Sequence, residues 1–463
     1  MLTKTYKAGG AVTLLALSCQ LHAGGFALIE HGASGLGNSY AGASAAAKDS
    51  STIWFNPAGM SLLEKREVAV AAHVINSNVE FTDRGTSLNY ALGGAPLGDP
   101  DNPSANDASP GGSTGLPNFY YVSPVSDKFS YGLGIGVPYG SATEYDDDWV
   151  GRYSTVKSGI NVIDINPSIS YKVSEKVRLG AGISVQQLSA ELGQAVDSGA
   201  ACFAIFDPID PAICINSALL PGNVATDGYA NVTGDSTAIS FNIGALFLPR
   251  PDTRIGVAYR HGTSHELDGD VEYTTNETLQ GLIDQFSVPA LLNGGAKADV
   301  DLPATLSFSV AHEFSEKLEI LADATWTGWS SFEELRIRFD LSPNDSFQIQ
   351  DWKDVWRISA GVNYQLNNKV TLRGGWAYDQ EPIPNESRRS PRIPGNDRTW
   401  ISAGLGYQFN TNASIDFGYA HLFLDDSAID NLSLDGSAGA PNIRGEYSTG
   451  IDIASFQFSW TFN

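Results

Sequence analysis

The 463-residue sequence is poor in basic residues and cysteine, and it has no long hydrophobic run. Lysine and arginine total 28 against 52 acidic residues, which gives a formal net charge of −24. A balance this acidic argues against nucleic-acid binding, because phosphates require a basic surface. No segment beyond the N-terminus approaches the roughly 18 consecutive apolar residues of a membrane-spanning helix. Helical membrane proteins are therefore excluded, whereas barrels that cross with alternating strands are not.

Residues 1–23 have the pattern of a cleavable signal peptide. Two lysines precede an apolar run from Ala11 to Leu17, and a small residue ends the segment. The apolar run is too short to span a bilayer. A lipoprotein anchored through Cys19 is the alternative, although Ala16 stands where such a site has leucine. The sequence predicts export, with a mature chain that starts at Gly24.

Cys202 and Cys214 remain once this leader is removed, and both lie in a segment rich in alanine, isoleucine and proline. In an oxidising compartment outside the cytoplasm such a pair is predicted to form a disulfide that staples a loop. The pattern lacks the additional ligands that a metal site needs. We therefore expect neither a metal nor a cofactor.

From about residue 67 onward, apolar residues alternate with small or polar ones. In one segment Ile165, Ile169 and Tyr171 alternate with Asn166 and Ser170. A period of two with one uniformly apolar face is typical of a strand that faces a continuous apolar medium. About fourteen segments follow this pattern, and they start near residues 67, 117, 128, 161, 176, 236, 252, 302, 316, 354, 368, 398, 411 and 451.

The connections between these segments alternate in length. Short ones carry turn residues, as in Ser126-Asp127-Lys128, and long ones lie between them. Short turns at one end and long loops at the other are typical of outer-membrane barrels. The alternative, a soluble β-sandwich, needs an apolar interior and no such asymmetry. The sequence predicts an all-β fold, in which residues 65–463 form a transmembrane antiparallel barrel of about fourteen strands.

The stretch from Gly24 to about Leu63 differs from everything after it. It consists largely of glycine, alanine and serine, and Asn56-Pro57-Ala58 lies near its end. A segment so poor in bulky side chains does not build a core of its own. Small residues let one backbone approach another closely. We expect residues 24–64 to fold into the barrel lumen as a plug, or hatch.

A resemblance to a known family begins in the same stretch, with GGFALIEHGASGLGNSYAG and, about thirty residues on, WFNPAGM. These segments resemble the FadL family of outer-membrane transporters of hydrophobic compounds. The similarity continues in EYDDDWVGRY, INPSISYKV and RIPGNDRTWISAGLGYQF and covers nearly the whole mature chain. It implies contact with outer-membrane lipid and lipopolysaccharide. The C-terminal SFQFSWTF resembles the strand that barrel-assembly machinery reads, and a closed barrel is expected to be a monomer.

The resemblance also implies gating elements. In the family an inward kink of the third strand opens the barrel wall sideways, and this role is carried over to Gly132, Gly134, Gly136 and Pro138. The alternative is that these glycines only provide clearance in the lumen. The hatch motif of the family corresponds to Asn56, Pro57 and Ala58, which are expected near the kink. Their expected role is gating and structural rather than direct contact with substrate.

Residues 200–222 and 281–292 are unusually apolar for exposed loops, and exposed apolar patches usually mark binding sites. We expect short loop helices that form an outer groove for a hydrophobic substrate, with these candidates: Phe203, Ile205, Phe206, Leu282, Ile283, Phe286 and Leu291. Arg388 and Arg389 belong to a basic stretch in this acidic chain. Their guanidinium groups either dock a fatty-acid carboxylate or pair with lumenal acids or lipopolysaccharide phosphate.

Catalysis has little support in the sequence. An outer-membrane phospholipase needs a histidine–serine pair with an orienting partner, and no spacing provides one. His261 and His265 are four apart on a strand-to-loop segment, where the helix-face spacing of zinc ligands does not apply. The acidic runs near Asp99 and Asp146 are either solvated or bind a divalent cation. We expect no enzyme.

These patterns together predict passive uptake of long-chain fatty acids or related hydrophobic compounds. The expected steps are capture in the loop groove, rearrangement of the hatch and lateral diffusion through the barrel wall. Transport of aromatic or alkane hydrocarbons by the same route stays open, because pocket shape decides among these substrates. A selective porin is a further alternative, and its steady conductance distinguishes it from a barrel with a hatch.

Overall fold

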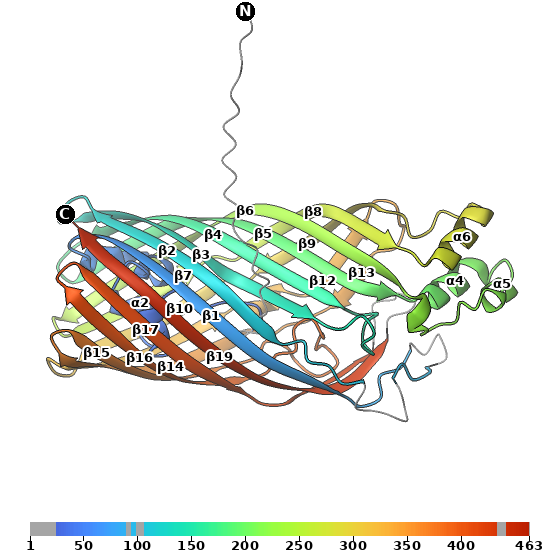
Figure 1. Ribbon diagram of the computed structural model, residues 1–463. Coiled ribbons are helices and arrows are strands. Elements are labelled where there is room, and N and C mark those ends of the chain that lie inside the picture. The colour runs from blue at the N-terminus through green and yellow to red at the C-terminus, as the bar shows by residue number, and fades with distance from the viewer. Residues whose placement is uncertain (1–24, 89–93, 99–105, 433–440, 463) are drawn as a thin grey trace, which may run out of the picture.

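The alternating segments form one antiparallel sheet that closes on itself (Figure 1). The structure, a computed structural model, describes residues 25–88, 94–98, 106–432 and 441–462, so the expected leader lies outside the described residues. Strand β1 (Arg66–Asp83) pairs along its whole length with β19 (Asn442–Phe462), and this pairing closes the barrel. The closed cylinder leaves no long unpaired edge at this seam.

Fourteen strands cross the wall within the described residues; nine are continuous and five are each divided in two. The other continuous strands are β2 (Gly112–Pro124), β3 (Phe129–Glu144), β4 (Lys157–Lys172), β5 (Val177–Val196), β6 (Gly228–Arg250), β15 (Val370–Asp379) and β16 (Arg398–Asn410). The divided strands are β7 (Thr253–Arg260) with β8 (Thr263–Thr274), β9 (Gly294–Leu302) with β10 (Thr305–Glu313), β11 (Leu318–Thr327) with β12 (Glu334–Phe339), β13 (Ser346–Ile349) with β14 (Val355–Asn367), and β17 (Ala413–Leu424) with β18 (Ser427–Leu432). The predicted barrel of about fourteen strands is confirmed.

The alternation in the sequence separates an outer from an inner face of the wall. On β4 the side chains of Ile165 and Ile169 are exposed, whereas those of Asn166, Ser168 and Ser170 are buried. Exposed apolar residues recur on the outer face of the other strands, as they do in barrels surrounded by lipid. Within the described residues, no helix is long and apolar enough to cross a membrane.

The two ends of the barrel differ as the sequence predicts. Short turns, such as residues 125–128, join strands at one end, and long connections leave the other. The long connections carry α4 (Ser198–Phe206), α5 (Ala212–Asn216) and α6 (Glu277–Phe286), which project beyond the wall on the right in Figure 1. The connections also contain the short 3₁₀ helices η4 (Val224–Thr226) and η5 (Trp329–Ser331).

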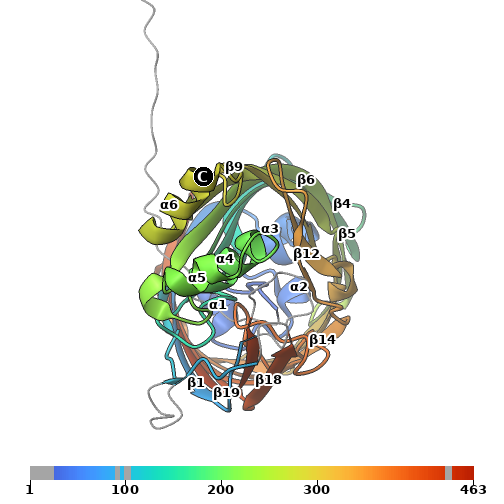
Figure 2. The ribbon, with the colours of Figure 1, turned by 90° about the vertical axis from the view of Figure 1, so that its right-hand side faces the viewer.

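The N-terminal stretch lies inside the barrel. Figure 2, which looks along the barrel, shows its blue helices within the ring of strands. They are α1 (Ala33–Leu36), α2 (Ala43–Ala46), α3 (Thr52–Phe55) and the 3₁₀ helix η1 (Pro57–Leu62). Glycine allows the contact with the wall: a Cβ atom on Gly375 would lie 2.1 Å from a backbone carbon of Asn38. The hatch therefore packs backbone against backbone, as its composition predicts.

Candidate functional site

The barrel wall has a gap between β2 and β3 in the half toward the long loops. The two strands pair only as far as Phe119 and Ile135. Beyond this point, among the described strands, residues 112–118 of β2 pair only with β1 and residues 136–144 of β3 pair only with β4. The N-terminal residues 26–31, termed the strap, lie against this gap from the inside.

The strap is hydrogen-bonded to both sides of the gap. The main-chain amide of Leu28 donates to the carbonyl of Pro138 at 2.8 Å, and the amide of Gly140 donates to the carbonyl of Phe26 at 2.9 Å. The strap thus pairs with the free edge of β3 as an added strand. On the other side, the side-chain amide of Asn118 on β2 donates at 2.7 Å to the carbonyl of Glu30 in the strap. These bonds stand in place of the missing β2–β3 ladder.

Aromatic packing holds the start of the strap. The ring of Phe26 lies among Trp329, Phe332, Tyr139 and Trp352, with centroid distances of 4.8, 5.8, 6.0 and 6.0 Å. Most of these contacts are edge-to-face, the arrangement that aromatic quadrupoles favour. Phe26 therefore fills an aromatic box whose walls come from β3 and from the segments between the divided strands.

Burial shifts the pKa of both titratable side chains of the strap, Glu30 and His31. It raises the pKa of Glu30 from 4.5 to about 7, although hydrogen bonds from the backbone and the charge of Arg357 oppose the shift. Burial also lowers the pKa of His31 well below its usual 6.5, and the positive charge of Arg260 adds to this. The Nδ1 atom of His31 is 3.1 Å from the hydroxyl oxygen of Tyr120 on β2. In the docked strap the histidine is thus neutral.

A largely apolar cavity adjoins the strap and the hatch. It contains about 1080 Å³ of space not filled by atoms, including its open mouth. The enclosed part of the cavity has a volume of about 140 Å³. Its apolar lining comes from strap, hatch and wall together: Leu28, Ile29, Tyr40, Trp54, Phe55, Pro138, Tyr139, Trp329, Val355 and Trp400. Apolar groups of a ligand can be sheltered there from water.

Arg357 on β14 brings a positive charge to this cavity. Its side chain is only 7 % exposed, and Nη2 donates at 2.9 Å to the carbonyl of Ser39. The guanidinium carbon is 5.0 Å from the ring centroid of Trp400. Its Nε and Nη1 atoms have no hydrogen-bond partner among the described residues. Buried donors of this kind are costly to leave unpaired, so the geometry suits an anionic group on a ligand.

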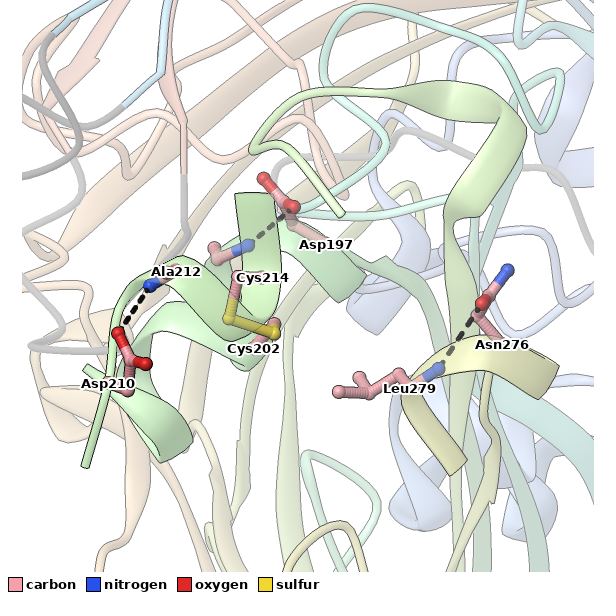
Figure 3. The surroundings of a disulfide bond; sticks show 8 residues. Asp197, Cys202, Asp210, Ala212, Cys214, Asn276 and Leu279 are labelled. Atoms are coloured by element: carbon pink, nitrogen blue, oxygen red, sulfur yellow. Dashed lines mark hydrogen bonds between the residues drawn. A yellow bond between two sulfur atoms is a disulfide. The ribbon is translucent and has the colours of Figure 1, made fainter. Parts of the chain in front are cut away.

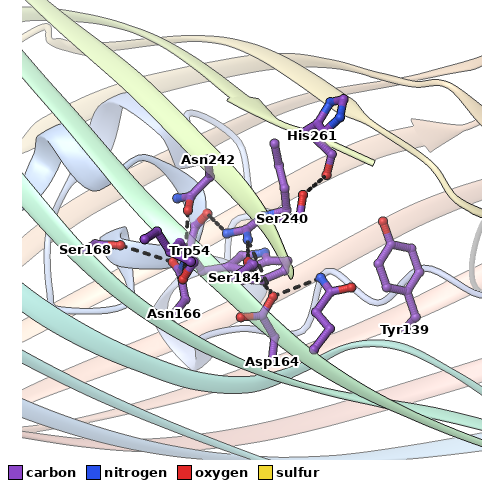
Figure 4. A network of polar contacts seen from close by, with 12 residues as sticks. Trp54, Tyr139, Asp164, Asn166, Ser168, Ser184, Ser240, Asn242 and His261 are labelled. Atoms are coloured by element: carbon purple, nitrogen blue, oxygen red, sulfur yellow. Dashed lines mark hydrogen bonds and ion pairs between the residues drawn. The ribbon is translucent and has the colours of Figure 1, made fainter. Parts of the chain in front are cut away.

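Arg260 on β7 also lines the cavity, but its donors are engaged. Nη1 donates to the hydroxyl of Ser184 at 2.6 Å and lies 3.6 Å from a carboxylate oxygen of Asp164. Nη2 donates to the carbonyl of Trp54 at 3.2 Å. Figure 4 shows Trp54 beside this polar network on the inner face of β4, β5 and β6. Arg260 therefore fixes the hatch to the wall and is less available to a ligand than Arg357.

The hatch motif is an anchor to the wall. Asn56 is fully buried, and its Nδ2 atom donates to the carbonyls of Ser44 at 2.7 Å and Ala245 at 3.1 Å. Its Oδ1 atom accepts from the amide of Ala58 at 3.0 Å, and the hydroxyl of Ser170 donates to the carbonyl of Ala58 at 3.1 Å. Pro57 begins η1 directly after Asn56. These polar bonds lead to β4 and β6, on the β3 side of the gap, so the motif ties the hatch to the wall there.

The four predicted residues of β3 fall into two pairs. Added Cβ atoms on Gly132 and Gly134 would lie 2.7 and 3.1 Å from Ile53 in the hatch, so these glycines provide clearance. Gly136 and Pro138 lie where the β3–β4 register shifts and where β3 has left β2. The second pair alone borders the gap.

The apolar loop residues gather in one cluster, which joins two loops distant in sequence. Phe206 and Ile283 are buried in it, and Phe203, Ile205, Leu282 and Leu291 pack around them. Phe286 is 40 % exposed, and its ring centroid is 5.4 Å from that of Phe206. The expected helices are present as α4, α5 and α6. Because much of the apolar surface is shared between these helices, less of it is open than the sequence suggests.

A disulfide between Cys202 and Cys214 joins α4 to α5 (Figure 3). The carboxylate of Asp197 caps α4 by accepting from the amide of Ala200 at 2.8 Å, and Asn276 caps α6 through the amide of Thr278 at 2.9 Å. Polar caps and the disulfide thus fix the helices that carry the apolar cluster.

The two predicted arginines are both in ion pairs. Arg388 lies 2.9 Å from a carboxylate oxygen of Asp351. Arg389 is buried and lies 3.0 Å from Glu381, whose pKa burial raises although Arg389 opposes the shift. Of the two alternatives, pairing with acids of the same chain is what the structure contains. Arg388 also lines a larger cavity of mixed polarity at the loop end, of about 2340 Å³ including open solvent.

The arrangement of the described side chains gives no support to a metal site or to a site shared by His261 and His265. Within the described residues, no three histidine, cysteine or acidic side chains gather as metal ligands. His265 is buried and its Nε2 atom is 3.3 Å from Gln186, whereas His261 is exposed and stacks on Phe241. The two histidines therefore do not share a site. Asp99 lies outside the described residues.

Comparison with known proteins decides the family. The model of the family described as "Outer membrane protein transport protein (OMPP1/FadL/TodX)" matches residues 14–462. The chain belongs to this family. It is accordingly an outer-membrane transport protein, and the predicted resemblance to FadL is confirmed.

Relatives of this FadL-family chain include curated proteins and solved structures. The "Long-chain fatty acid transport protein" of Escherichia coli O6:H1 is 28 % identical over 90 % of each chain. "Outer membrane protein P1" of Haemophilus influenzae is 30 % identical over 89 % of each. A solved Pseudomonas aeruginosa FadL homologue superposes with a TM-score of 0.83 at 27 % identity, over 95 % of this chain and 100 % of that one. The Pseudomonas putida toluene transporter TodX shares the fold, with a TM-score of 0.63 at 18 % identity over 89 % and 94 %.

Sequence reasoning missed the residues that build the cavity. Arg357 stands in the alternating pattern of β14, at a polar position that faces the lumen. A charged residue on the inner face of a membrane strand often marks a functional site, so the sequence alone could have pointed to Arg357. Arg260 carries the same signal on the inner face of β7. Phe26 and Trp54 had none, because each acquires its role only from partners far away in the sequence.

Proposed function

We propose that this protein takes up long-chain fatty acids passively across the outer membrane. The observation that carries the proposal is the pairing of an apolar cavity with Arg357, a buried arginine that has two donor atoms without a partner among the described residues. A molecule with a long apolar chain and one carboxylate matches both features. Neither toluene nor an alkane satisfies the guanidinium. The protein acts without a catalytic step and as a monomer in lipid and lipopolysaccharide, after insertion by the barrel-assembly machinery.

The proposed route has three steps. The substrate is captured at the apolar loop cluster of α4, α5 and α6, which stands at the loop end of the barrel. It then moves into the cavity, where its carboxylate pairs with Arg357. The strap finally leaves the gap, and the substrate diffuses between β2 and β3 into the membrane. Gly136 and Pro138 border this exit, and Asn56, Pro57 and Ala58 keep the hatch in place during it.

Ligand binding by the purified protein tests the head-group assignment. Oleate and oleyl alcohol are compared on the native chain and on Arg357→Met, which keeps the volume and removes the charge. A hydrogen bond to a charged group contributes about 1.5–3 kcal/mol, so Arg357→Met should weaken oleate binding about 10- to 100-fold. The affinity for oleyl alcohol should hardly change. Arg388→Met is the matched control, since Arg388 lies outside this cavity.

Uptake in a strain that lacks its own carrier tests the substrate class. Complementation with this gene should restore growth on oleate and not the uptake of toluene. Restored toluene uptake alone would keep the route and assign a hydrocarbon substrate. A steady conductance of the native protein in planar bilayers would contradict the route and indicate a porin.

A further inference from the structure

The indole of Trp54 in α3 is clamped between the strap and the barrel wall. Its ring stacks on the imidazole of His31, with centroids 4.0 Å apart and planes inclined by 22°. The guanidinium carbon of Arg260 lies 3.6 Å from the indole ring centroid. Two contacts this close cannot share one face of the ring, so the indole is covered on both faces. A cation over an indole is a favourable contact, more so when it is shielded from water.

Both ends of this stack are anchored at functional places. His31 belongs to the strap and lies 3.1 Å from the hydroxyl of Tyr120, on the β2 side of the gap. Its Nε2 atom has no hydrogen-bond partner among the described residues, so stacking on Trp54 is a large part of what holds the ring. Arg260 is held by Ser184 on β5 and Asp164 on β4, on the β3 side of the gap. The stack thus links β2 to the network of Figure 4.

Trp54 also lines the apolar cavity, whereas His31 does not. A chain that enters the cavity meets Leu28 and Ile29 of the strap directly. It reaches the ring of His31 through Trp54, which stacks on it, and through Phe55, which meets it only edge-on at 6.2 Å. We infer that Trp54 is the positioning residue through which occupancy of the cavity releases the strap. An apolar chain that displaces the indole removes the surface on which His31 is stacked, and the strap loses its link to the hatch. This inference rests on the proposed function for the identity of the ligand.

Hydrogen exchange of the strap measures this link without relying on transport. The amides of Leu28 and Gly140 are protected only while the strap is docked on β3, because each is bonded across that junction. Without ligand, Trp54→Leu should accelerate exchange of both amides at least tenfold, and Trp54→Phe should restore most of the protection. Phe55→Leu is the matched control, since Phe55 lines the same cavity but meets His31 only edge-on, with centroids 6.2 Å apart, and has no contact with Arg260 like that of Trp54. Exchange in β14 should stay unchanged in all variants.

Addition of oleate then tests whether occupancy of the cavity is coupled to release of the strap. In the native protein oleate should accelerate exchange of the strap, and in Trp54→Leu it should still bind but add no further acceleration. Unchanged strap exchange in ligand-free Trp54→Leu overturns the inference, and so does an equal effect of Phe55→Leu. Failure of oleate to bind the native protein refutes the proposed substrate instead, and the ligand-free comparison still decides whether Trp54 holds the strap.

Discussion

The amide of Leu28 donates a 2.8 Å hydrogen bond to the carbonyl of Pro138, and the strap thereby completes the wall at the point where β3 has left β2. The neighbouring residues Ala27 and Tyr139 form an antiparallel bridge. The hydrogen bonds on either side of this bridge make it a non-hydrogen-bonded pair, in which Cα atoms are about 4.5 Å apart. Such a pair is within the range that a disulfide spans.

A covalent lock on the strap should therefore close the exit. We expect the double variant Ala27→Cys/Tyr139→Cys to cross-link under oxidising conditions and to lose at least nine-tenths of oleate uptake. Tyr139→Cys alone, which disturbs the aromatic box without a cross-link, is the control. Alkylation of remaining thiols checks that the bond is complete. Full cross-linking with normal uptake would show that the strap need not move.

Contact between hatch and wall should depend on single glycines. A Cβ atom on Gly180 would lie 2.2 Å from the amide nitrogen of Ala58, whereas one on Gly159 meets no atom within 4 Å. Gly180→Ala should push the hatch from the wall, because overpacking at a close backbone contact costs about 1–3 kcal/mol. Planar-bilayer recordings should show open-channel current for Gly180→Ala and almost none for Gly159→Ala. Silent recordings from a folded Gly180→Ala barrel would argue that the hatch tolerates the displacement.

Docking of the strap should respond to pH through two opposed groups. Docking raises the pKa of Glu30 from 4.5 to about 7, so this residue favours docking at low pH and the contribution is lost as the pH rises through 7. Docking lowers the pKa of His31 well below 6.5, so this residue favours docking above 6.5 and its contribution is lost as the pH falls. Between 4.5 and 6.5 the two dependences largely cancel.

Substitution of either residue should reveal the pH dependence of docking that the other one causes. In Glu30→Gln the strap should be released as the pH falls below 6.5, and in His31→Phe it should be released as the pH rises from 4.5 to 7, by up to about tenfold per pH unit. Exchange of the Leu28 amide, corrected for the intrinsic effect of pH, provides the measurement. The native strap should show a flat profile. If exchange of the Leu28 amide changed with pH in the same direction in both variants, the opposed roles of Glu30 and His31 would be contradicted.

Removal of the loop disulfide should weaken capture and leave the barrel intact. Bonds of this kind commonly contribute about 2–4 kcal/mol, and this one joins the helices that carry the apolar cluster. In Cys202→Ser/Cys214→Ser we expect faster proteolysis of residues 198–216 and slower oleate uptake at low concentration. The shift of the folded barrel on unheated gels should be the same as in the native protein. Native protein treated with reductant is the matched comparison.

Much of the fold followed from local sequence. Alternation along β4 and β14 predicted both the outer and the inner face of the wall, because the side-chain period of a strand is two. The small residues of the hatch predicted its place in the lumen, since only they permit such close backbone contact. Cys202 and Cys214 were predicted as partners from their number and compartment alone.

The site was decided by tertiary structure. The gap at Gly136 and Pro138 became visible only in the pairing register, and the strap that fills it comes from the N-terminal stretch before β1. Arg357 became a candidate for binding a ligand, because two of its donor atoms have no hydrogen-bond partner among the described residues. Arg388 and Arg389, in contrast, are paired with carboxylates of the same chain. Local pattern determined which side chains face the lumen. Which of them meet there depends on strand register and on contacts between residues hundreds of positions apart, and no local pattern encodes these.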